Sequence, residues 1–395
     1  MRSIFLRLVL VILAMNVLCY YWMDSFVHQL VPHRSEWRRL ELSALERTEK
    51  LFSYSRHVKT NLAKKQSLGT GEVQSQSIKL KPMNLQTIDQ KTADMLHRAS
   101  LLMDDLILSP PPCEDSIYLL IMVISSAKNF NRRTGMRDSI KVRPYRGKSV
   151  RFVFVTARAD DQMTDAKLHY ESLRYRDIIL TNHKDAYRNM TYKALETLKW
   201  KLTKCQHAKF LLKMDDDVLV IYENIVDYAI DLELKNLTVV YAGMRNNVKV
   251  VRDPKSKWYM SHKDYANDTL PPYISGYAIL FSQVAVREIY RASFHVSRVY
   301  KIPRQTFPID DAFIGICAHY AKIKLTKMRW ACLVWNYLKH AVTKEKCILV
   351  KLKVVHQIPG YRSMKRYLKW LQTRSVHERN ACRKKDITLT KTCFW

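Results

Sequence analysis

The sequence lacks the short motifs by which zinc sites and the common nucleic-acid-binding modules are recognised. None of its eight cysteines belongs to a Cys-x-x-Cys pair, which argues against a zinc site. It contains no zinc-finger pattern of two cysteines and two histidines, no RNP-like motif and no arginine-rich tract. Nucleic-acid binding is therefore supported only by the formal net charge of +31, and no nucleic-acid partner is expected.

Acidic residues are few relative to basic ones, because the 395 residues include 67 Lys and Arg but only 36 Asp and Glu. This balance favours anionic partners: nucleic acid, acidic lipid or glycan, or a phosphate-bearing substrate. The basic residues are spread along the chain, so much of the charge is expected to be solvated surface. The length and a hydrophobic content of 47% allow a catalytic domain of ordinary size with attachments.

The cysteines fit an oxidising compartment. Cys19 lies in an apolar N-terminal run, and the other seven form an odd set. At least one of these is therefore expected to be free or to pair with another molecule, and the sequence does not determine the pairing.

Residues 8–23 form an uncharged run rich in Leu, Val and aromatic residues. With residues 4–6 it approaches the roughly 17–20 residues needed to span a thin bilayer. Arg2 and Arg7 precede it, which favours a cytoplasmic tail over residues 1–7. We expect an uncleaved signal anchor; a cleaved signal peptide is the alternative, and both send the following chain into the secretory lumen. Three Asn-x-Thr sequons agree with this destination, at Asn189, Asn236 and Asn267.

Residues 24–115 are predicted to form a lumenal stem, followed by a catalytic domain over residues 116–395. Residues 66–81 are rich in Ser, Gln and Gly, which is typical of a linker. Apolar residues recur at helical spacing over residues 84–108, and Ser109–Pro112 then ends that segment.

Apolar runs and periodic segments alternate through the catalytic domain. Strands are predicted at 117–124, 151–156, 177–180, 209–214 and 239–242, and helices from about 131 and over 192–200. Strands that alternate with helices indicate an α/β sandwich with a largely parallel sheet.

Three consecutive aspartates, Asp215, Asp216 and Asp217, end the strand predicted at 209–214. Carboxylates at the carboxyl end of a strand lie where open α/β sheets bind ligands. In an extended chain Asp215 and Asp217 point to the same side, which suits a hard divalent cation that also holds a substrate's phosphates. The alternative is a polar turn whose aspartates cap a helix.

Three arginines, Arg132, Arg133 and Arg137, follow the first strand at the predicted start of a helix. Their guanidinium groups could bind a diphosphate through paired hydrogen bonds; exposed, solvated arginines are the alternative.

Two later segments contain further candidate residues. A turn carrying Ser275 and Gly276 would let backbone approach a ligand closely. Asp310 and Asp311 follow at a predicted helix start. They either cap the helix or supply a general base near a reactive hydroxyl.

His356 follows a short apolar run near the C-terminus. A neutral imidazole could complete a metal site supplied by Asp217, although a packed histidine is the alternative. The segment 361–385 is basic with interleaved aromatic residues, which suits an anionic acceptor, a membrane surface or a solvated helix face.

Together these residues resemble the β1,3-glycosyltransferase family, which includes β1,3-galactosyltransferases and β1,3-N-acetylglucosaminyltransferases. The similarity covers roughly residues 117–356. Five segments match in order: Arg132–Arg137, Asp185–Trp200, Lys209–Val220, Lys257–Ser282 and Ile309–Gly315.

The resemblance implies a nucleotide-sugar-binding fold of the glycosyltransferase-A type: an open mixed sheet flanked by helices. It implies a single-pass type II membrane enzyme of the Golgi, with the endoplasmic reticulum also possible. The donor would be a UDP-sugar and the acceptor a glycoprotein or glycolipid. The product would be a β1,3 linkage formed with inversion.

The resemblance also implies roles for individual residues. Asp217 would be the principal ligand of Mn²⁺ or Mg²⁺, with Asp215 and Asp216 facing metal, ribose or sugar. His356 would be a further metal ligand. Asp311 would be the catalytic carboxylate and Asp310 its fallback.

Ile274 and Ala278 depart from the family pattern around Gly276, where Cys and a further Gly are usual. The alternative is therefore a catalytically silent family member that binds glycans or stabilises a partner.

Overall fold

The computed structural model describes residues 106–246, 249–300, 306–329, 331–332, 345, 347–358, 360–373 and 375–385. These residues belong to one compact unit, Leu85–Trp395. The predicted tail, anchor and most of the stem lie outside them. Within the described part of the chain, no helix is long and apolar enough to cross a membrane.

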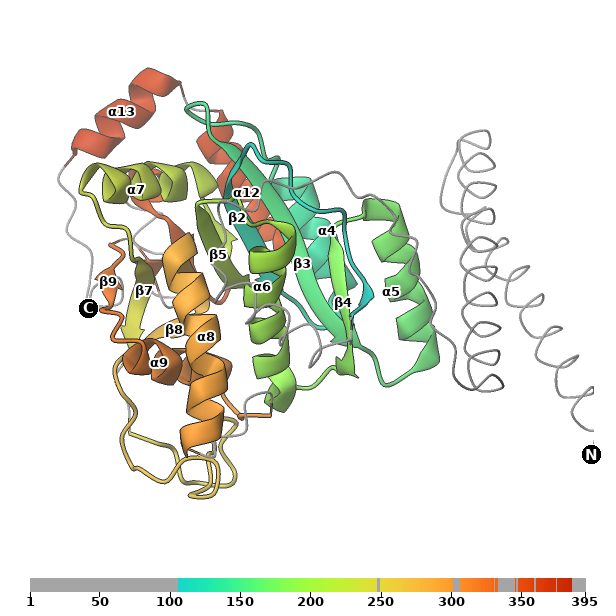
Figure 1. Ribbon diagram of the computed structural model, residues 1–395. Coiled ribbons are helices and arrows are strands. Elements are labelled where there is room, and N and C mark those ends of the chain that lie inside the picture. The colour runs from blue at the N-terminus through green and yellow to red at the C-terminus, as the bar shows by residue number, and fades with distance from the viewer. Residues whose placement is uncertain are drawn as a thin grey trace, which may run out of the picture. The chain divides into compact units, whose positions relative to one another are not determined.

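An eight-stranded sheet forms the centre of the domain, in the order β1-β4-β3-β2-β5-β8-β7-β9 (Figure 1). Its strands are β1 (Leu106–Leu108), β2 (Ile117–Ile124), β3 (Ser149–Arg158), β4 (Ile178–Lys184), β5 (Phe210–Asp215), β7 (Tyr241–Asn246), β8 (Tyr273–Ser282) and β9 (Thr326–Lys327). Strands β2 to β5 pair in parallel, whereas β8 is antiparallel to β5. The predicted α/β fold with a mostly parallel sheet is confirmed.

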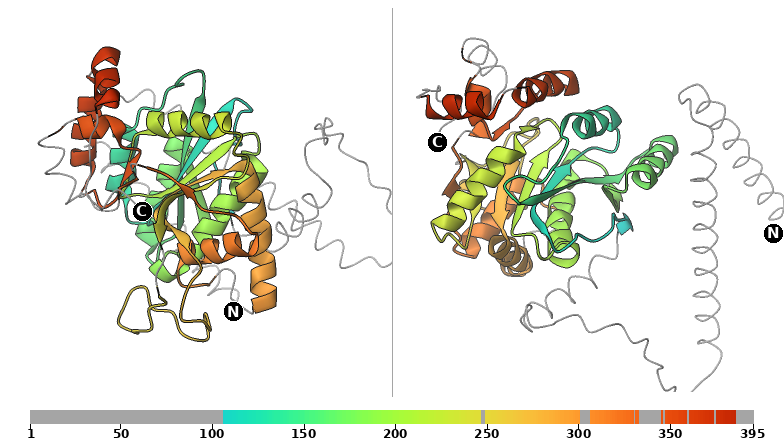
Figure 2. Two further views of the ribbon diagram at one scale, coloured as in Figure 1. Left: turned by 90° about the vertical axis from the view of Figure 1, so that its left-hand side faces the viewer. Right: turned by 90° about the horizontal axis from the view of Figure 1, so that it is seen from above.

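Helices cover both faces of this sheet, as Figure 2 shows from two further sides. One hydrophobic core includes residues of α4 (Phe130–Ser139), α5 (Gln162–Tyr175), α7 (Tyr222–Leu234), α11 (Cys347–Lys351) and α12 (Tyr361–Gln372). The other includes residues of α6 (Met190–Lys204), α8 (Gln283–Tyr300) and α9 (Asp310–Tyr320). The short helix α13 (Val376–Lys384) follows α12.

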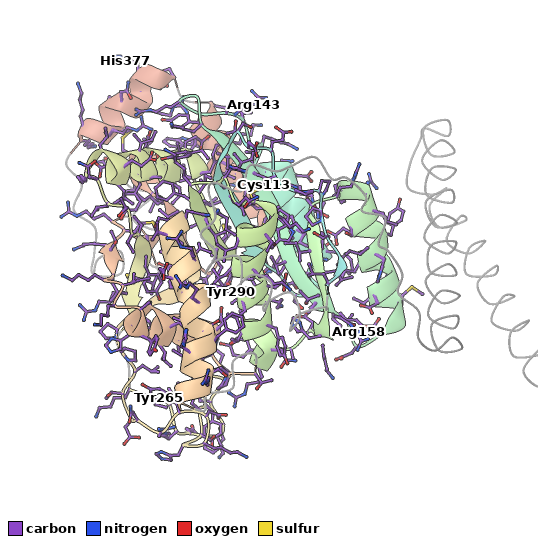
Figure 3. All side chains as sticks on the ribbon, in the orientation of Figure 1. Cys113, Arg143, Arg158, Tyr265, Tyr290 and His377 are labelled. Carbon is purple, nitrogen blue, oxygen red and sulfur yellow. A yellow bond between two sulfur atoms is a disulfide. The ribbon has the colours of Figure 1, made fainter. Side chains whose placement is uncertain are left out.

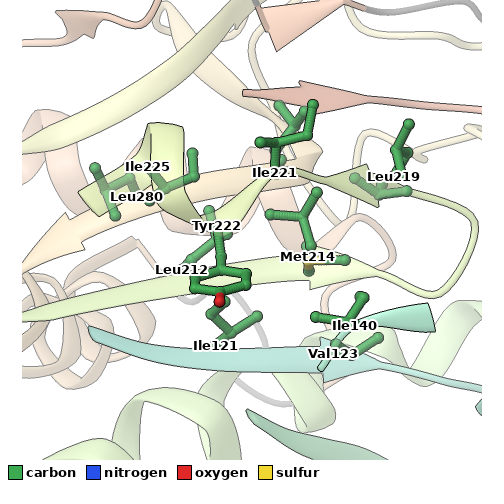
Figure 4. Packing of buried hydrophobic residues seen from close by; sticks show 14 of the residues in the cluster. Ile121, Val123, Ile140, Leu212, Met214, Leu219, Ile221, Tyr222, Ile225 and Leu280 are labelled. Carbon is green, nitrogen blue, oxygen red and sulfur yellow. The ribbon is translucent and has the colours of Figure 1, made fainter. Parts of the chain in front are cut away.

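Strand β2 shows why the sequence forms this sandwich. Its side chains alternate between the two cores: Ile121 and Val123 belong to the first, and Leu120 and Met122 to the second. Because both faces are covered, a parallel strand of this kind is a continuous apolar run. Figure 4 shows the first core, where Ile121 and Val123 lie near side chains of β5 and α7.

A second, three-stranded sheet brings the C-terminal region back to β5. It has the order β10-β11-β6, with β10 (Ala331–Cys332), β11 (Val354–Val355) and β6 (Leu219–Val220). Val355 pairs with Leu219, so His356 lies across from the segment that follows the three aspartates.

Among the described residues, two disulfides join segments that are distant in sequence. Cys113 is bonded to Cys205 at the end of α6, and Cys347 in α11 to Cys382 in α13. Both agree with the expected oxidising compartment.

Two expectations differ from the structure. Leu106, expected near the end of a helix, lies in β1, because its backbone pairs with β4 at the sheet edge. Gly276, expected in a turn, lies within β8. In the pairing of β7 with β8, Gly243 is opposite Ile279, but Arg245 is already opposite Ile274. The regular pairing of the two strands is therefore interrupted next to Gly276.

Candidate functional site

The three aspartates diverge at the carboxyl end of β5. Asp216 turns toward the neighbouring β2, where its Oδ2 accepts hydrogen bonds from Ser125 Oγ (2.8 Å) and Asn129 Nδ2 (2.7 Å). Arg132 Nη1 lies 3.8 Å from Asp216 Oδ1. These hydrogen bonds fix Asp216 to the loop between β2 and α4.

Asp215 and Asp217 face His356. Each of the three offers a ligand atom, and these atoms lie within 4.8 Å of one another. His356 Nε2 is 3.3 Å from Asp217 Oδ1, and the imidazole ring stacks on Tyr277 with ring centroids 4.8 Å apart. The same-side geometry predicted for Asp215 and Asp217 brings them together with the predicted histidine.

Buried polar atoms in this group have no hydrogen-bond partner among the described residues: Asp215 Oδ1 and His356 Nδ1. Burial raises the pKa of Asp215 to about 7, with a further contribution from the charge of Asp310. Burial also acts to raise the pKa of Asp217, but the hydrogen bond and charge of His356 and the charge of Arg132 outweigh it and lower this pKa. A bound cation would stabilise the charged form of carboxylates that lie close together without enough counter-charge.

Asp310 and Asp311 begin α9, as predicted, but neither caps it. The N-cap position is Ile309, and it makes no side-chain capping bond. Asp311 instead reaches β8, where its Oδ2 accepts a hydrogen bond from the Gly276 N–H (2.7 Å). Its Oδ1 accepts one from the Ala312 N–H (2.8 Å). Neither aspartate occupies the N-cap position, and Asp311 accepts one hydrogen bond from the first turn of α9 and one from the sheet.

The pKa of Asp311 is raised to about 7, first by burial and then by the charge of Asp310. A carboxylate whose pKa lies near neutral pH can accept a proton and remain a base at working pH. The geometry of Asp311 therefore suits the general-base role.

Gly276 lets β8 approach Asp311 closely. A Cβ at this position would lie 3.1 Å from both Asp311 Cβ and Asp311 Oδ2, so the carboxylate would have to shift by a few tenths of an ångström to make room for it. Ser275, its predicted partner, lies beside it in β8 and is half-buried.

Lys213 is a site residue that the sequence interpretation missed. Its side chain is fully buried, and Nζ lies 2.8 Å from Asp310 Oδ2 and 4.0 Å from Asp215 Oδ1. It also donates to the carbonyl of Gly276 (3.1 Å). One ammonium thus connects Asp215 of β5 with the aspartate pair of α9. The available signal was a lysine inside the apolar run 209–214, two residues before Asp215.

Of the three predicted arginines, the structure brings only Arg132 to the aspartates. Arg133 is fully buried and pairs with Glu171 (2.7 Å). Arg137 pairs with Glu171 (2.6 Å) and with Asp177 (2.8 Å). Arg133 thus connects α4 to α5, and Arg137 connects α4 both to α5 and to Asp177, the residue before β4. The paired hydrogen bonds that were expected to hold a diphosphate here hold the protein's own carboxylates.

One exposed aromatic residue, Tyr187, borders the carboxylates, and the sequence interpretation did not single it out. Burial and the charges of Asp310 and Asp311 raise the pKa of Tyr187 to about 12, so its hydroxyl stays protonated near them. Trp258 is 52% exposed and lies in the long connection between β7 and β8. That connection, which includes Tyr265, projects beyond α8 and α9 (Figure 3). Lys257 Nζ lies 4.6 Å from the Trp258 ring centroid.

Comparison with known proteins gives a consistent result. A profile of the family described as Galactosyltransferase matches residues 127–329. The chain is 28% identical over 214 residues to beta-1,3-galactosyltransferase 1 of Mus musculus, covering 54% of this chain and 63% of the relative. It is 29% identical over 211 residues to human lactosylceramide 1,3-N-acetyl-beta-D-glucosaminyltransferase, covering 51% and 54%.

A Danio rerio protein, lactosylceramide 1,3-N-acetyl-beta-D-glucosaminyltransferase B, is 32% identical over 219 residues, covering 53% of this chain and 56% of the relative. The chain thus spans less than two thirds of the length of these relatives. Among solved structures, apo mouse xyloside xylosyltransferase 1 matches at 11% identity with a TM-score of 0.32, covering 61% of this chain and 97% of that one.

Proposed function

The chain belongs to the galactosyltransferase family, and from this premise we propose that it is a hexosyltransferase. It would transfer galactose or an N-acetylhexosamine from a UDP-sugar to a hydroxyl of an acceptor glycan, with inversion and in a β1,3 linkage. One observation carries the proposal. Asp311, set by Gly276, and the group of Asp215, Asp217 and His356 belong to one connected site, because Lys213 lies between them.

Asp215, Asp217 and His356 would hold a divalent cation. Two carboxylates and one imidazole are a donor set that suits Mn²⁺. The buried atoms Asp215 Oδ1 and His356 Nδ1, which have no hydrogen-bond partner among the described residues, fit this use. When bound, the ion would supply charge stabilisation to the departing diphosphate of UDP. Ser125 and Asn129 hold Asp216 aside from this group, so that Asp215 and Asp217 remain for ligation.

Asp311 would remove the proton from the acceptor hydroxyl as the oxygen attacks the anomeric carbon. The Gly276 and Ala312 N–H groups fix both carboxylate oxygens, so the base is oriented before the acceptor arrives. Lys213 compensates the charge of Asp310, which keeps two adjacent carboxylates tolerable at a buried helix start. A single base with attack opposite the leaving group gives inversion.

The secretory location is part of this proposal. The apolar run at 8–23, the three sequons and the two disulfides support a single-pass type II protein of the Golgi membrane with a lumenal catalytic domain. The anchor itself lies outside the described residues.

The test is a donor screen with the full chain. The chain is incubated with each UDP-sugar, Mn²⁺ and a panel of acceptors, and UDP release is followed. Asp311→Asn, which keeps the shape of the carboxylate but cannot act as a base, serves as the blank. We expect release with one donor, dependent on both Mn²⁺ and Asp311. UDP binding without release from any donor, or equal release by Asp311→Asn, would refute the proposal.

A further inference from the structure

The helix α12, which begins five residues after His356, has a strongly cationic exposed face. Arg362, Lys365, Arg366 and Lys369 are all exposed. Their spacing of i, i+3, i+4 and i+7 places them on one side of an α-helix. We call these four residues the cationic stripe.

The stripe is not neutralised by its surroundings. No ion pair joins any of its four residues to an acid in the described part of the chain, and α12 itself contains no acidic residue. Asp138 on the neighbouring α4 is exposed and makes no ion pair with the stripe. The following helix differs, because Arg383 in α13 is paired with Asp227 (3.2 Å). Four unpaired cations on three turns of helix generate a local positive potential that favours an anionic partner.

The opposite face of α12 packs against the hydrophobic core. Leu368 and Leu371 are 8% and 7% exposed and belong to the core shared with α4 and α7. Helices α12 and α4 pack against each other, as Figures 1 and 2 also show. A helix that lies in a bilayer surface inserts its apolar face between the lipids, and here that face is already covered. The structure therefore favours a soluble polyanion over a membrane.

The stripe also leads away from the candidate active site. The start of α12 follows His356 closely, and the start of α4 carries Arg132, which lies beside Asp216. At the other end, Leu368 and Leu371 line a cavity together with Ser139 and Ile140, where α4 ends. A helix of this length spans about 18 Å, which corresponds to several sugar residues of an extended chain.

We propose that the cationic stripe binds an acidic glycan, a chain bearing sulfate or carboxylate groups, as the extended part of the acceptor whose end enters the active site. This inference rests on the proposed transferase function. The inference names a class of acceptor, which the carboxylates of the candidate site do not specify. Sulfate and carboxylate groups are spaced along such chains, so successive cations of one helix face can each meet an anion.

The test measures binding of the full chain, in mild detergent, to a chondroitin sulfate oligosaccharide in the absence of donor. The triple variant Lys365→Gln, Arg366→Gln, Lys369→Gln removes three charges of the stripe. The matched control Lys167→Gln, Lys204→Gln, Lys324→Gln removes three exposed charges elsewhere. Mn²⁺-dependent UDP binding, measured for both, shows that the fold and the nucleotide site persist. Phosphatidylserine vesicles are the competing probe.

We expect the stripe variant to bind the oligosaccharide about a hundredfold more weakly, because each of the three removed cations contributes about fivefold to binding an anionic surface. The control should change little, and the affinity of the wild type should fall with added salt. Equal losses in the two variants, or wild-type binding to vesicles but not to the glycan, would overturn the inference. Glycan binding without any UDP binding would instead count against the proposed function alone.

Discussion

Replacing Gly276 by alanine tests whether the placement of Asp311 controls catalysis. The new Cβ would lie 3.1 Å from Asp311 Oδ2 and Cβ. Since comfortable contacts of this kind lie near 3.5 Å, the carboxylate must retreat by about 0.4 Å. The backbone of Gly276 has no positive φ, so alanine should cause no other strain. The change therefore acts on the base and not on the strand.

The magnitude follows from the hydrogen bond that this shift weakens. The Gly276 N–H lies 2.7 Å from Asp311 Oδ2, and a bond to a charged acceptor contributes about 1.5–3 kcal/mol. Partial loss of about 1–2 kcal/mol in the transition state gives a roughly 5- to 30-fold fall in kcat. Because this N–H also lowers the pKa of Asp311, the acidic limb of the pH–rate profile should move to higher pH.

The assay is UDP release at saturating donor and acceptor, with calorimetric UDP binding and thermal unfolding as controls. Binding and unfolding should match the wild type. Gly360→Ala is the matched control, because a Cβ there would meet nothing within 4 Å and φ is 166°. It should be fully active. Wild-type kcat and an unshifted pH profile for Gly276→Ala would show that Asp311 is not the base.

Four further outcomes are expected. Asp217→Ala should abolish Mn²⁺-dependent UDP binding in calorimetry, as chelation should for the wild type; unchanged affinity would dismiss the metal site. Since the pKa of Asp311 is raised to about 7, kcat/KM should rise with pH through about 7 as this base loses its proton; a flat profile from pH 6 to 8 would contradict the assignment. Lys213→Met leaves buried carboxylates uncompensated and should cost about 3–5 kcal/mol in chemical denaturation, a loss that should shrink at acidic pH; an unchanged unfolding midpoint would argue against the ion-pair role. Arg133→Lys should lower the unfolding temperature through its pair with Glu171 while leaving the Kd for UDP unchanged, and weaker UDP binding at wild-type stability would restore its predicted diphosphate role.

Local chemistry was sufficient for much of the site. An apolar run that ends in three aspartates defines a buried strand with carboxylates at its carboxyl end, and strand alternation places Asp215 and Asp217 on one side. The start of α9 at Asp310 was likewise predictable. These features depend on residues close in sequence, whose geometry backbone periodicity determines.

The predictions that differed depend on contacts between distant segments. Arg133 and Arg137 have the residue types and spacing of a diphosphate clamp. Their guanidinium groups are instead paired with Glu171 of α5 and, for Arg137, with Asp177, the residue before β4. Gly276 lies in a strand because β5 and β7 pair with its flanking residues.

The sequence by itself determined the α/β class and the family resemblance, and it predicted Asp215, Asp217, Asp311 and His356 as site residues, because each of these depends on local pattern or on motifs in order. Only the tertiary structure decided that His356 meets Asp217 across β11 and β6, and that Lys213 connects Asp215 with Asp310. The physical reason is that a buried charge takes its role from its counter-charges, and folding brings these from segments more than 90 residues apart.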